Sequence, residues 1–239
     1  MCMIAVMTTD SKGIANYFSA ENFNRLQSIM YAKQVNKGDF LFWEGDAADK
    51  LYFVQKGGVR STKLSETGKN FILHLYQTGD LFGQVDPFHD SVHSVSAEVT
   101  EDSEIGVMLR KDLEVLLWQH GDLAIEFMKW MGLMHRMTET KLRDLMMFGK
   151  PGALCSLLIR LSNSYGKTQD GQIMIDYKIN HTEMADMIGA TRESVNRMLS
   201  DMKKANVVEI QNGHLFINDL SYLRDICHCE NCPVDICRM

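Results

Sequence analysis

The fold of this chain is decided by residues 180–217, which read NHTEMADMIGATRESVNRMLSDMKKANVVEIQNGHLFI. Asn180, with a glutamate three positions later, has the pattern of a helix start, and Gly189 predicts where that short helix ends. Thr191 can cap a second helix. The Asn212-Gly213 pair beyond it is the strongest short hairpin signal, because both residues can adopt positive φ. Helix, turn, helix and hairpin in this order predict a winged helix-turn-helix, whose second helix fits the major groove of DNA.

The second of these helices is predicted to have one apolar and one polar face. The apolar face carries Val195, Met198, Leu199 and Met202. The polar face carries Arg192, Glu193, Asn196 and Arg197. Arginine can donate two hydrogen bonds to guanine and glutamate can accept one from cytosine, so we predict that the polar face contacts base edges. The alternative is a solvated helix face, since the whole chain has a formal net charge of −6 and no overall attraction for DNA.

The region from about Tyr31 to Leu109 is rich in short β-forming runs that are separated by turn dipeptides. The turns are predicted at Lys37-Gly38, Glu44-Gly45, Gly57-Gly58, Thr67-Gly68 and Thr78-Gly79. Turn signals that recur this regularly predict an antiparallel sandwich, jelly roll or barrel.

Residues Gly121 to Met147 are nearly free of glycine and proline, and their periodicity predicts one long helix. Its apolar stripe consists of Phe127, Met131, Met134, Leu142 and Leu145. We favour a dimer seam for this stripe, and the alternative is that it packs on its own domain. The following Gly149-Lys150-Pro151-Gly152 is expected to break the helix as a hinge, and the helical run from Ala153 to Tyr165 to open a second domain.

Four of the six cysteines lie near the end of the sequence, at Cys227, Cys229, Cys232 and Cys237. Residues 1–7 lack a basic leader and no apolar run approaches the roughly 18 residues of a membrane span, so we expect a cytoplasmic protein with no membrane partner. Thiols stay reduced in the cytoplasm, which favours metal ligation or redox sensing over disulfides. From spacing alone, an iron-sulfur cluster and a structural zinc site completed by Cys227 or His228 both remain open.

The segment Ala190–Arg197, ATRESVNR, is similar to the Arg-Glu-x-Val-x-Arg recognition helix of the CRP/FNR family of bacterial transcription regulators. The resemblance extends over nearly the full chain. It implies an activator that binds double-stranded DNA as a homodimer, with RNA polymerase as a further partner. Arg192, Glu193 and Arg197 would read a palindromic TGTGA-type half-site, and Asn196 stands where the enteric FNR pattern has serine.

The resemblance also implies an α+β fold in four parts. An N-terminal antiparallel β-roll, a jelly-roll-like sensor domain, is expected over residues 1–119 and a dimerisation helix over residues 120–149. The winged helix-turn-helix domain is expected over residues 150–226, and a cysteine-rich, cluster-binding tail over residues 227–239.

Family members that bind a cyclic nucleotide carry Gly-Glu and Arg-Ser motifs in the β-roll. This chain has Gly83-Gln84 at the first motif, and the segment from His89 to Ser94 contains no arginine. A cyclic phosphate would therefore lack a charge-assisted partner, and we expect no cyclic nucleotide to bind.

The C-x2-C-x4-C spacing of the tail resembles the Bacillus-type Fnr branch, the anaerobic regulators with a C-terminal cysteine group. That branch implies one [4Fe-4S] cluster per subunit and oxygen sensing. The ligands carried over are Cys229, Cys232, Cys237 and Asp144, the last from the stretch Thr140–Leu145 of the long helix. Cys227 is too close to Cys229 to share the ligation, while Cys2 and Cys155 are interpreted as a terminal residue and a buried thiol.

Three alternatives stay open at this point. The chain could be a regulator of the same family with structural zinc, or an iron-sulfur electron-transfer protein, although the winged helix argues against the latter. Asp144 could be an ordinary solvated carboxylate. No nucleophile, base and orienting group occur together, and histidines such as His74, His120 and His135 are interpreted as structural, so we expect no enzymatic activity.

Overall fold

The computed structural model describes residues 13, 17–85, 91–169 and 171–239. Residues 1–7, which include Cys2, lie outside this part, and so do His89 and Asp90 at the start of the segment that contains no arginine. Contacts divide the chain into two compact units, one within residues 1–63 and 73–130 and the other formed by residues 64–72 and 131–239.

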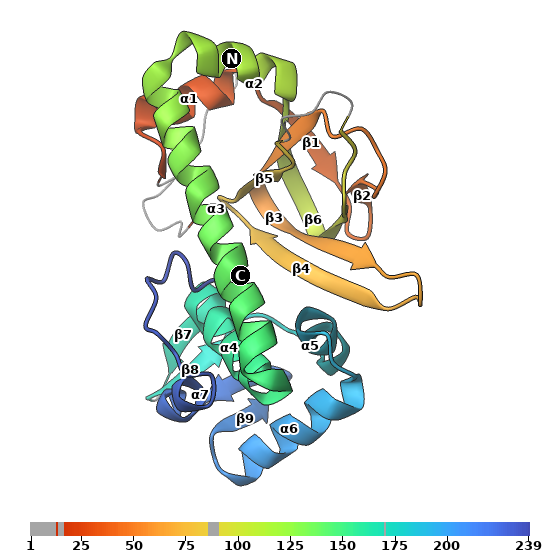
Figure 1. The fold of residues 1–239 in the computed structure, drawn as a ribbon, viewed down its shortest axis with the longest axis vertical. Helices are drawn as coiled ribbons and strands as arrows, with labels where there is room; N and C mark the ends of the chain where they lie inside the picture. The colour runs from red at the N-terminus through yellow and green to blue at the C-terminus, as the bar shows by residue number, and fades with distance from the viewer. Residues whose placement is uncertain (1–12, 14–16, 86–90, 170) are drawn as a thin grey trace. The chain divides into compact units, whose positions relative to one another are not determined.

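The N-terminal half is an antiparallel β-roll flanked by helices (Figure 1). Its elements are α1 (Ala20–Ser28), β1 (Tyr31–Val35), β2 (Phe40–Phe42), β3 (Lys50–Leu64), β4 (Asn70–Gln77), β5 (Leu81–Gly83), β6 (Ser96–Leu109) and α2 (Arg110–Gln119). The sheet runs in the order β1-β6-β3-β4, with β2 also pairing with β6 and β5 with β3. The prediction of an antiparallel β domain is confirmed.

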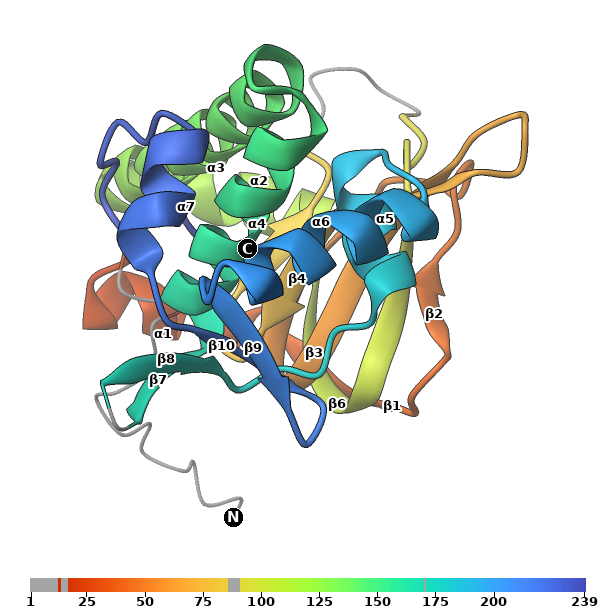
Figure 2. The ribbon, with the colours of Figure 1, turned by 90° about the horizontal axis from the view of Figure 1, so that it is seen from below.

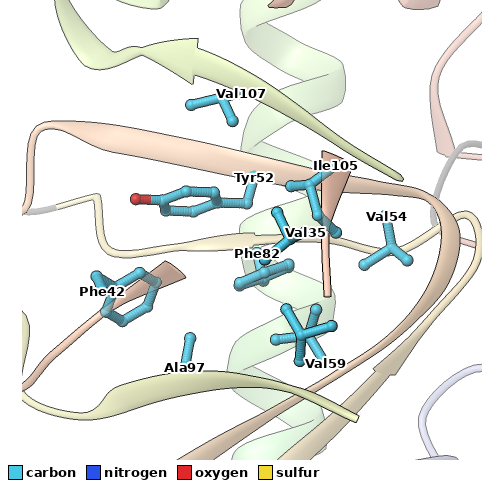
Figure 3. Close-up of a cluster of buried hydrophobic side chains, with 10 residues drawn as sticks. Val35, Phe42, Tyr52, Val54, Val59, Phe82, Ala97, Ile105 and Val107 are labelled. Carbon is cyan, nitrogen blue, oxygen red and sulfur yellow. The ribbon is translucent and has the colours of Figure 1, made fainter. Parts of the chain in front are cut away.

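Apolar side chains from several strands fill the inside of the β-roll (Figure 3). The cluster consists of Val35, Phe42, Tyr52, Val54, Val59, Phe82, Ala97, Val99, Ile105 and Val107. The Phe82 ring stacks on Tyr76 with centroids 4.4 Å apart and on Tyr52 at 5.4 Å. Aromatic stacking of this kind adds to the free energy gained by apolar burial and gives the interior a fixed shape.

The predicted turn at Gly57-Gly58 is wrong, because both residues lie inside the long strand β3. The register of β3 against β6 shifts between Lys56 and Gly58, so the two glycines form a bulge. Gly57 has φ 101°, and a Cβ there would stand 2.1 Å from Ser103 Oγ. Position 57 requires glycine because β3 and β6 approach closely there. The Gly57-Gly58 pair therefore marks a bulge within a strand rather than a turn between two strands.

The long helix α3 (Gly121–Met147) has the predicted bounds. Its predicted stripe is wrong at Phe127, which is buried in its own unit beside Phe18 and Trp130. Met131, Leu142 and Leu145 of the predicted stripe are exposed, and so are the neighbouring apolar side chains of Ile125, Met128 and Met146. The helix therefore has one apolar face buried within the chain and another that is open.

The C-terminal unit is built around α4 (Gly149–Tyr165), whose residues 152–161 are all buried. The predicted helix break is confirmed, because α3 ends at Met147 and α4 begins at Gly149. Gly149–Gly152 is not a hinge but the first turn of α4, where Pro151 loses no hydrogen bond because first-turn N–H groups have no helical partner. The remaining elements are β7 (Gly166–Gln169), β8 (Gln172–Ile175), α5 (His181–Ile188), α6 (Arg192–Lys204), β9 (Val208–Gln211), β10 (His214–Ile217) and α7 (Leu220–Ile226). The four strands form one sheet in the order β7-β8-β10-β9.

A buried histidine predicts that the stability of the β-roll falls in acid. The His93 ring stacks on Phe42 with centroids 3.6 Å apart, and burial lowers the pKa of His93 below its ordinary 6.5, although Asp46 and Asp49 act in the opposite direction. Because the unfolded chain then binds the proton more tightly, stability is full above about pH 6.5 and falls as the pH drops below it. We expect His93→Phe to keep the stacking and flatten this dependence in urea unfolding between pH 5 and 7. An unchanged slope relative to wild type would contradict the assignment.

Candidate metal centre and nucleic-acid interface

The tail, defined as residues 227–239, follows α7 and folds back along α4 (Figure 1). The Cys229 N–H donates a hydrogen bond to the last turn of α7 at 2.9 Å. His228 and Asn231 take up left-handed backbone conformations, with φ of 46° and 54°. These residues turn the chain twice within a few positions, so the cysteines face one region rather than lying along an extended strand.

One small cavity in the C-terminal unit is lined by all four predicted metal ligands. The thiols of Cys229, Cys232 and Cys237 come from the tail, and the carboxylate of Asp144 comes from α3. The other residues around the cavity are Arg143, Ser156, Ile159, Arg160, Cys227 and Glu230. The structure thus brings together side chains from two distant segments of the sequence.

Asp144 is buried, which excludes its interpretation as a solvated carboxylate. Its Oδ1 accepts hydrogen bonds from Arg143 Nε at 3.0 Å and Nη2 at 2.8 Å. Its Oδ2 accepts from Arg160 Nη2 at 2.8 Å and from the Ser156 hydroxyl. Burial alone would raise the pKa of Asp144, but these hydrogen bonds and the charge of Arg160 bring it below the ordinary value. The carboxylate therefore stays ionised inside the unit.

The two arginines also connect Asp144 to the tail. Arg143 pairs through Nη1 with the carboxylate of Glu230, which lies between Cys229 and Cys232. Arg160 is almost fully buried, and its Nη1 donates to the main-chain oxygen of Ile236 at 3.1 Å. Each guanidinium thus joins α3 to the segment that carries the thiols.

The donors around the cavity, three thiols and one carboxylate, have the chemistry that either an iron-sulfur cluster or a zinc ion uses. In the described part of the chain, no three His, Cys, Asp or Glu side chains are arranged to hold one metal ion. The ligands of one zinc ion must all approach a single point to about 2.0–2.3 Å. The ligands of an iron-sulfur cluster bind separate irons and stand further apart. The cavity measures about 20 Å³, so the thiol side chains must turn outward to admit such a group.

Cys227 and Cys155 have the surroundings of protonated thiols. The Cys227 Sγ donates to the Arg224 main-chain oxygen at 3.7 Å, and burial raises the pKa of Cys227 to about 11. Cys155 is fully buried on α4, where burial raises its pKa to about 12. Burial raises the pKa of Cys237 as well, so protonation does not distinguish Cys227, which also touches the cavity, from the predicted ligands.

The helix-turn-helix forms as its capping residues predict. Asn180 and Glu183 make a reciprocal capping box at the start of α5, and Gly189 ends that helix with φ 61°. The Thr191 hydroxyl accepts from the Ser194 N–H at 3.2 Å at the start of α6. Figure 2 shows α5 and α6 with the β9–β10 hairpin that forms the wing.

The predicted base-contacting side chains lie on the solvent side of α6. Arg192, Glu193, Asn196 and Arg197 are all exposed. Val195, Leu199 and Met202 are buried on the opposite side and Met198 is half-buried, as predicted. A groove between α6 and the wing is lined by His181, Asn196, Leu199, Ser200, Lys203, Val208, Glu209 and Ile210. This surface therefore presents a polar helix face next to a hairpin, the arrangement that a major groove accepts.

An antiparallel β-roll, a long helix and a winged helix-turn-helix define a class of DNA-binding transcription regulators. The chain matches a family model described as "Cyclic nucleotide-binding domain" over residues 32–120 and one described as "Crp-like helix-turn-helix domain" over residues 152–226. It is 39% identical over 241 residues to the "Anaerobic regulatory protein" of Bacillus subtilis, and the match covers 100% of both chains. The chain belongs to the CRP/FNR family of transcription regulators.

More distant proteins share the fold. The "Global nitrogen regulator" of Synechocystis is 26% identical, with 82% of this chain and 90% of that protein covered. A solved structure of a CooA mutant from Carboxydothermus hydrogenoformans has a TM-score of 0.75 at 20% identity, covering 92% of this chain and 98% of that one. FixK2 from Bradyrhizobium japonicum has a TM-score of 0.71 at 20% identity, covering 83% and 97%.

Family membership fixes the broad function. Regulators of this family bind DNA and dimerise, and the chain is a transcription regulator rather than an enzyme. None of the helices in the described ranges combines the length and apolar character that crossing a membrane requires.

Three residues that hold the Asp144 carboxylate at the candidate site, Arg143, Ser156 and Arg160, were not singled out in the sequence. Ser156 and Arg160 lie in the middle of α4, within a run that has the composition of an ordinary buried helix. A charged residue among ten consecutive buried positions was the available signal, because a buried arginine requires an acidic or carbonyl partner.

Proposed function

We propose that this chain is an oxygen-responsive regulator of anaerobic genes, switched by one [4Fe-4S] cluster per subunit. The observation that carries the proposal is that Cys229, Cys232, Cys237 and Asp144 line one small cavity. The Bacillus subtilis protein that matches over its whole length is named an anaerobic regulator, and this supports the same conclusion.

Three thiolates and one carboxylate supply one ligand for each of four irons. When bound, the cluster would supply the reactivity toward oxygen that protein side chains lack. The carboxylate is a weaker iron ligand than a thiolate and leaves its iron more open to oxygen. Structural zinc is the rival occupant, and the likeness to a protein named an anaerobic regulator favours the cluster over it.

Binding of the cluster by residues of two segments would fix the orientation of α3 relative to the DNA-binding elements. Asp144 lies on α3, whereas the cysteines follow the winged helix-turn-helix, so a group bound by both fixes α3 relative to the DNA-binding elements. We propose that the exposed residues Ile125, Met128, Leu142 and Met146 of α3 pack against a second copy of the chain. Their positions differ by steps of three, four and multiples of seven, which suits a parallel helix pair.

The β-roll is proposed to serve this regulator without a cyclic nucleotide. Gln84 replaces the acidic residue of the nucleotide-binding pattern, and its Oε1 accepts from the Ser94 N–H at 3.2 Å. Arg60 is paired with Glu98 at 2.8 Å. The stacked rings of Tyr52, Tyr76 and Phe82 further reduce the interior space.

At the DNA, Arg192, Glu193 and Arg197 are proposed to read a palindromic TGTGA-type site, with Asn196 beside them. The exposed position of all four on α6 supports this assignment. RNA polymerase is the proposed protein partner at the promoters so bound.

The ligand assignment predicts a sharp division among the cysteines. Cys229→Ser, Cys232→Ser and Cys237→Ser should each abolish the brown colour and the iron and sulfide of protein purified without oxygen, because each removes a thiolate. Cys227→Ser and Cys155→Ser should retain them, and Asp144→Ala should weaken the centre more than the control Asp102→Ala. Colourless wild-type protein that contains zinc would overturn the cluster.

The recognition helix makes a second prediction. Arg197→Ala and Glu193→Ala should each cost about 1–3 kcal/mol on the specific site and relax discrimination at the contacted base pair. If the Lys203 side chain at the groove edge contacts only phosphate, Lys203→Ala should weaken binding to all DNA sequences alike and reduce the salt dependence of binding. Equal losses for Arg197→Ala on specific and random DNA would show that α6 does not read bases.

The switch itself is tested by an anaerobic titration of a labelled TGTGA-type palindrome with half-sites about 34 Å apart. Holo protein should bind tightly, and brief exposure to air should reduce the iron-sulfur absorbance and the operator affinity in parallel. Added cyclic nucleotide should restore neither. If the apo protein binds as tightly as the holo protein, the metal centre is not the switch.

A further inference from the structure

The last turn of the tail is held against α4 by hydrogen bonds that use main-chain groups of the tail. Arg160 Nη1 donates to the Ile236 oxygen at 3.1 Å, and Asn163 Nδ2 donates to the Cys237 oxygen at 2.6 Å. The Met239 N–H donates to Ser164 Oγ at 2.9 Å. The thiol of Cys237 is therefore not needed for the bond that its own residue makes.

The three side chains on α4 form one docking face. Residues 160, 163 and 164 are three and four positions apart, which places them on the same side of a helix. Ser156 lies one turn earlier on this side and donates to Asp144. The face therefore contacts α3 at one end and the tail at the other.

Apolar burial adds to these bonds. The side chains of Ile236 and Met239 are both buried within the C-terminal unit. Removing them from water favours the docked tail whether or not the cysteines hold a metal.

The guanidinium of Arg160, one rigid group, contacts both Asp144 of α3 and Ile236 of the tail. Its Nη2 donates to Asp144 at 2.8 Å while its Nη1 donates to Ile236, and the residue is only 4% exposed. A buried guanidinium is costly unless its N–H groups are paired, so neither partner can leave without a penalty.

From these contacts we infer that Arg160, Asn163 and Ser164 dock the tail on α4 independently of any metal. Arg160 is the positioning residue that keeps Asp144 facing the cysteines. The inference rests on the proposed function only for the identity of the group that the cysteines bind. It follows that loss of that group leaves the tail in place, and that the change in DNA binding starts from the contacts of Asp144 rather than from release of the tail.

The test is amide hydrogen exchange at Cys237 and Met239 in full-length, metal-free protein. Both amides donate hydrogen bonds in the docked tail, so both should exchange slowly in wild type. A variant with Cys229, Cys232 and Cys237 all replaced by serine should keep this protection. Arg160→Met and Asn163→Ala should each speed the exchange by about tenfold, the effect of one lost hydrogen bond.

Arg143→Met is the matched control, because it also removes a guanidinium from Asp144 but reaches the tail only through the exposed Glu230. It should leave exchange at Cys237 and Met239 unchanged. Should Arg160→Met fail to fold, as judged by exchange along α4, Asn163→Ala and Ser164→Ala decide the matter. Exchange at free-peptide rates in metal-free wild type or in the triple serine variant overturns the inference. Iron content of anaerobically purified protein is measured separately, so failure of the cluster proposal is distinguishable from failure of the docking.

Discussion

The buried ion pair between Asp144 and Arg160 is the interaction on which the C-terminal unit depends. It joins α3 to α4, and the same guanidinium reaches the tail through the Ile236 oxygen. The desolvation of two charges offsets much of their attraction, so the net stabilisation is smaller than the geometry suggests. Its main effect is on alignment, because removing Asp144 leaves the buried charge of Arg160 uncompensated, whereas removing Arg160 leaves Asp144 paired with Arg143 alone. α3, α4 and the tail are thereby held in a fixed arrangement.

This alignment is continuous with the DNA-binding elements. α4 packs against α5 and α7, and Lys150 Nζ at its start donates to the Ile188 oxygen at 2.9 Å, directly before the Gly189 turn. A change in the contacts of Asp144 therefore acts on the helix that supports the recognition helix. The physical requirement for a switch is a second arrangement of these contacts with a different DNA affinity, and a ligand shifts the balance only by binding the two arrangements unequally.

The sequence was most informative where its signals are local. Asn180, Gly189 and Asn212-Gly213 fix their own backbone conformations, so the winged helix-turn-helix could be predicted from neighbouring residues alone. Strand β7, with the sequence GKTQ, has no apolar alternation and exists because it pairs with β8 in space. The assignment of Phe127 to the open face of α3 failed for a related reason, since periodicity does not say which of two apolar faces the chain itself covers. The role of Arg160 was hidden because its partners lie 16 and 76 positions away.

The same surroundings explain why a carboxylate suits the fourth position of the proposed ligand set. Burial raises the pKa of Cys227 to about 11 and that of Cys155 to about 12, so these two thiols are neutral without a metal. Asp144 instead has a lowered pKa and stays charged beside Arg160. A thiol in its place would leave Arg160 with no counter-charge whenever the metal was absent. The carboxylate compensates the buried arginine in the metal-free protein, and it can therefore serve as a ligand without making the fold depend on the metal.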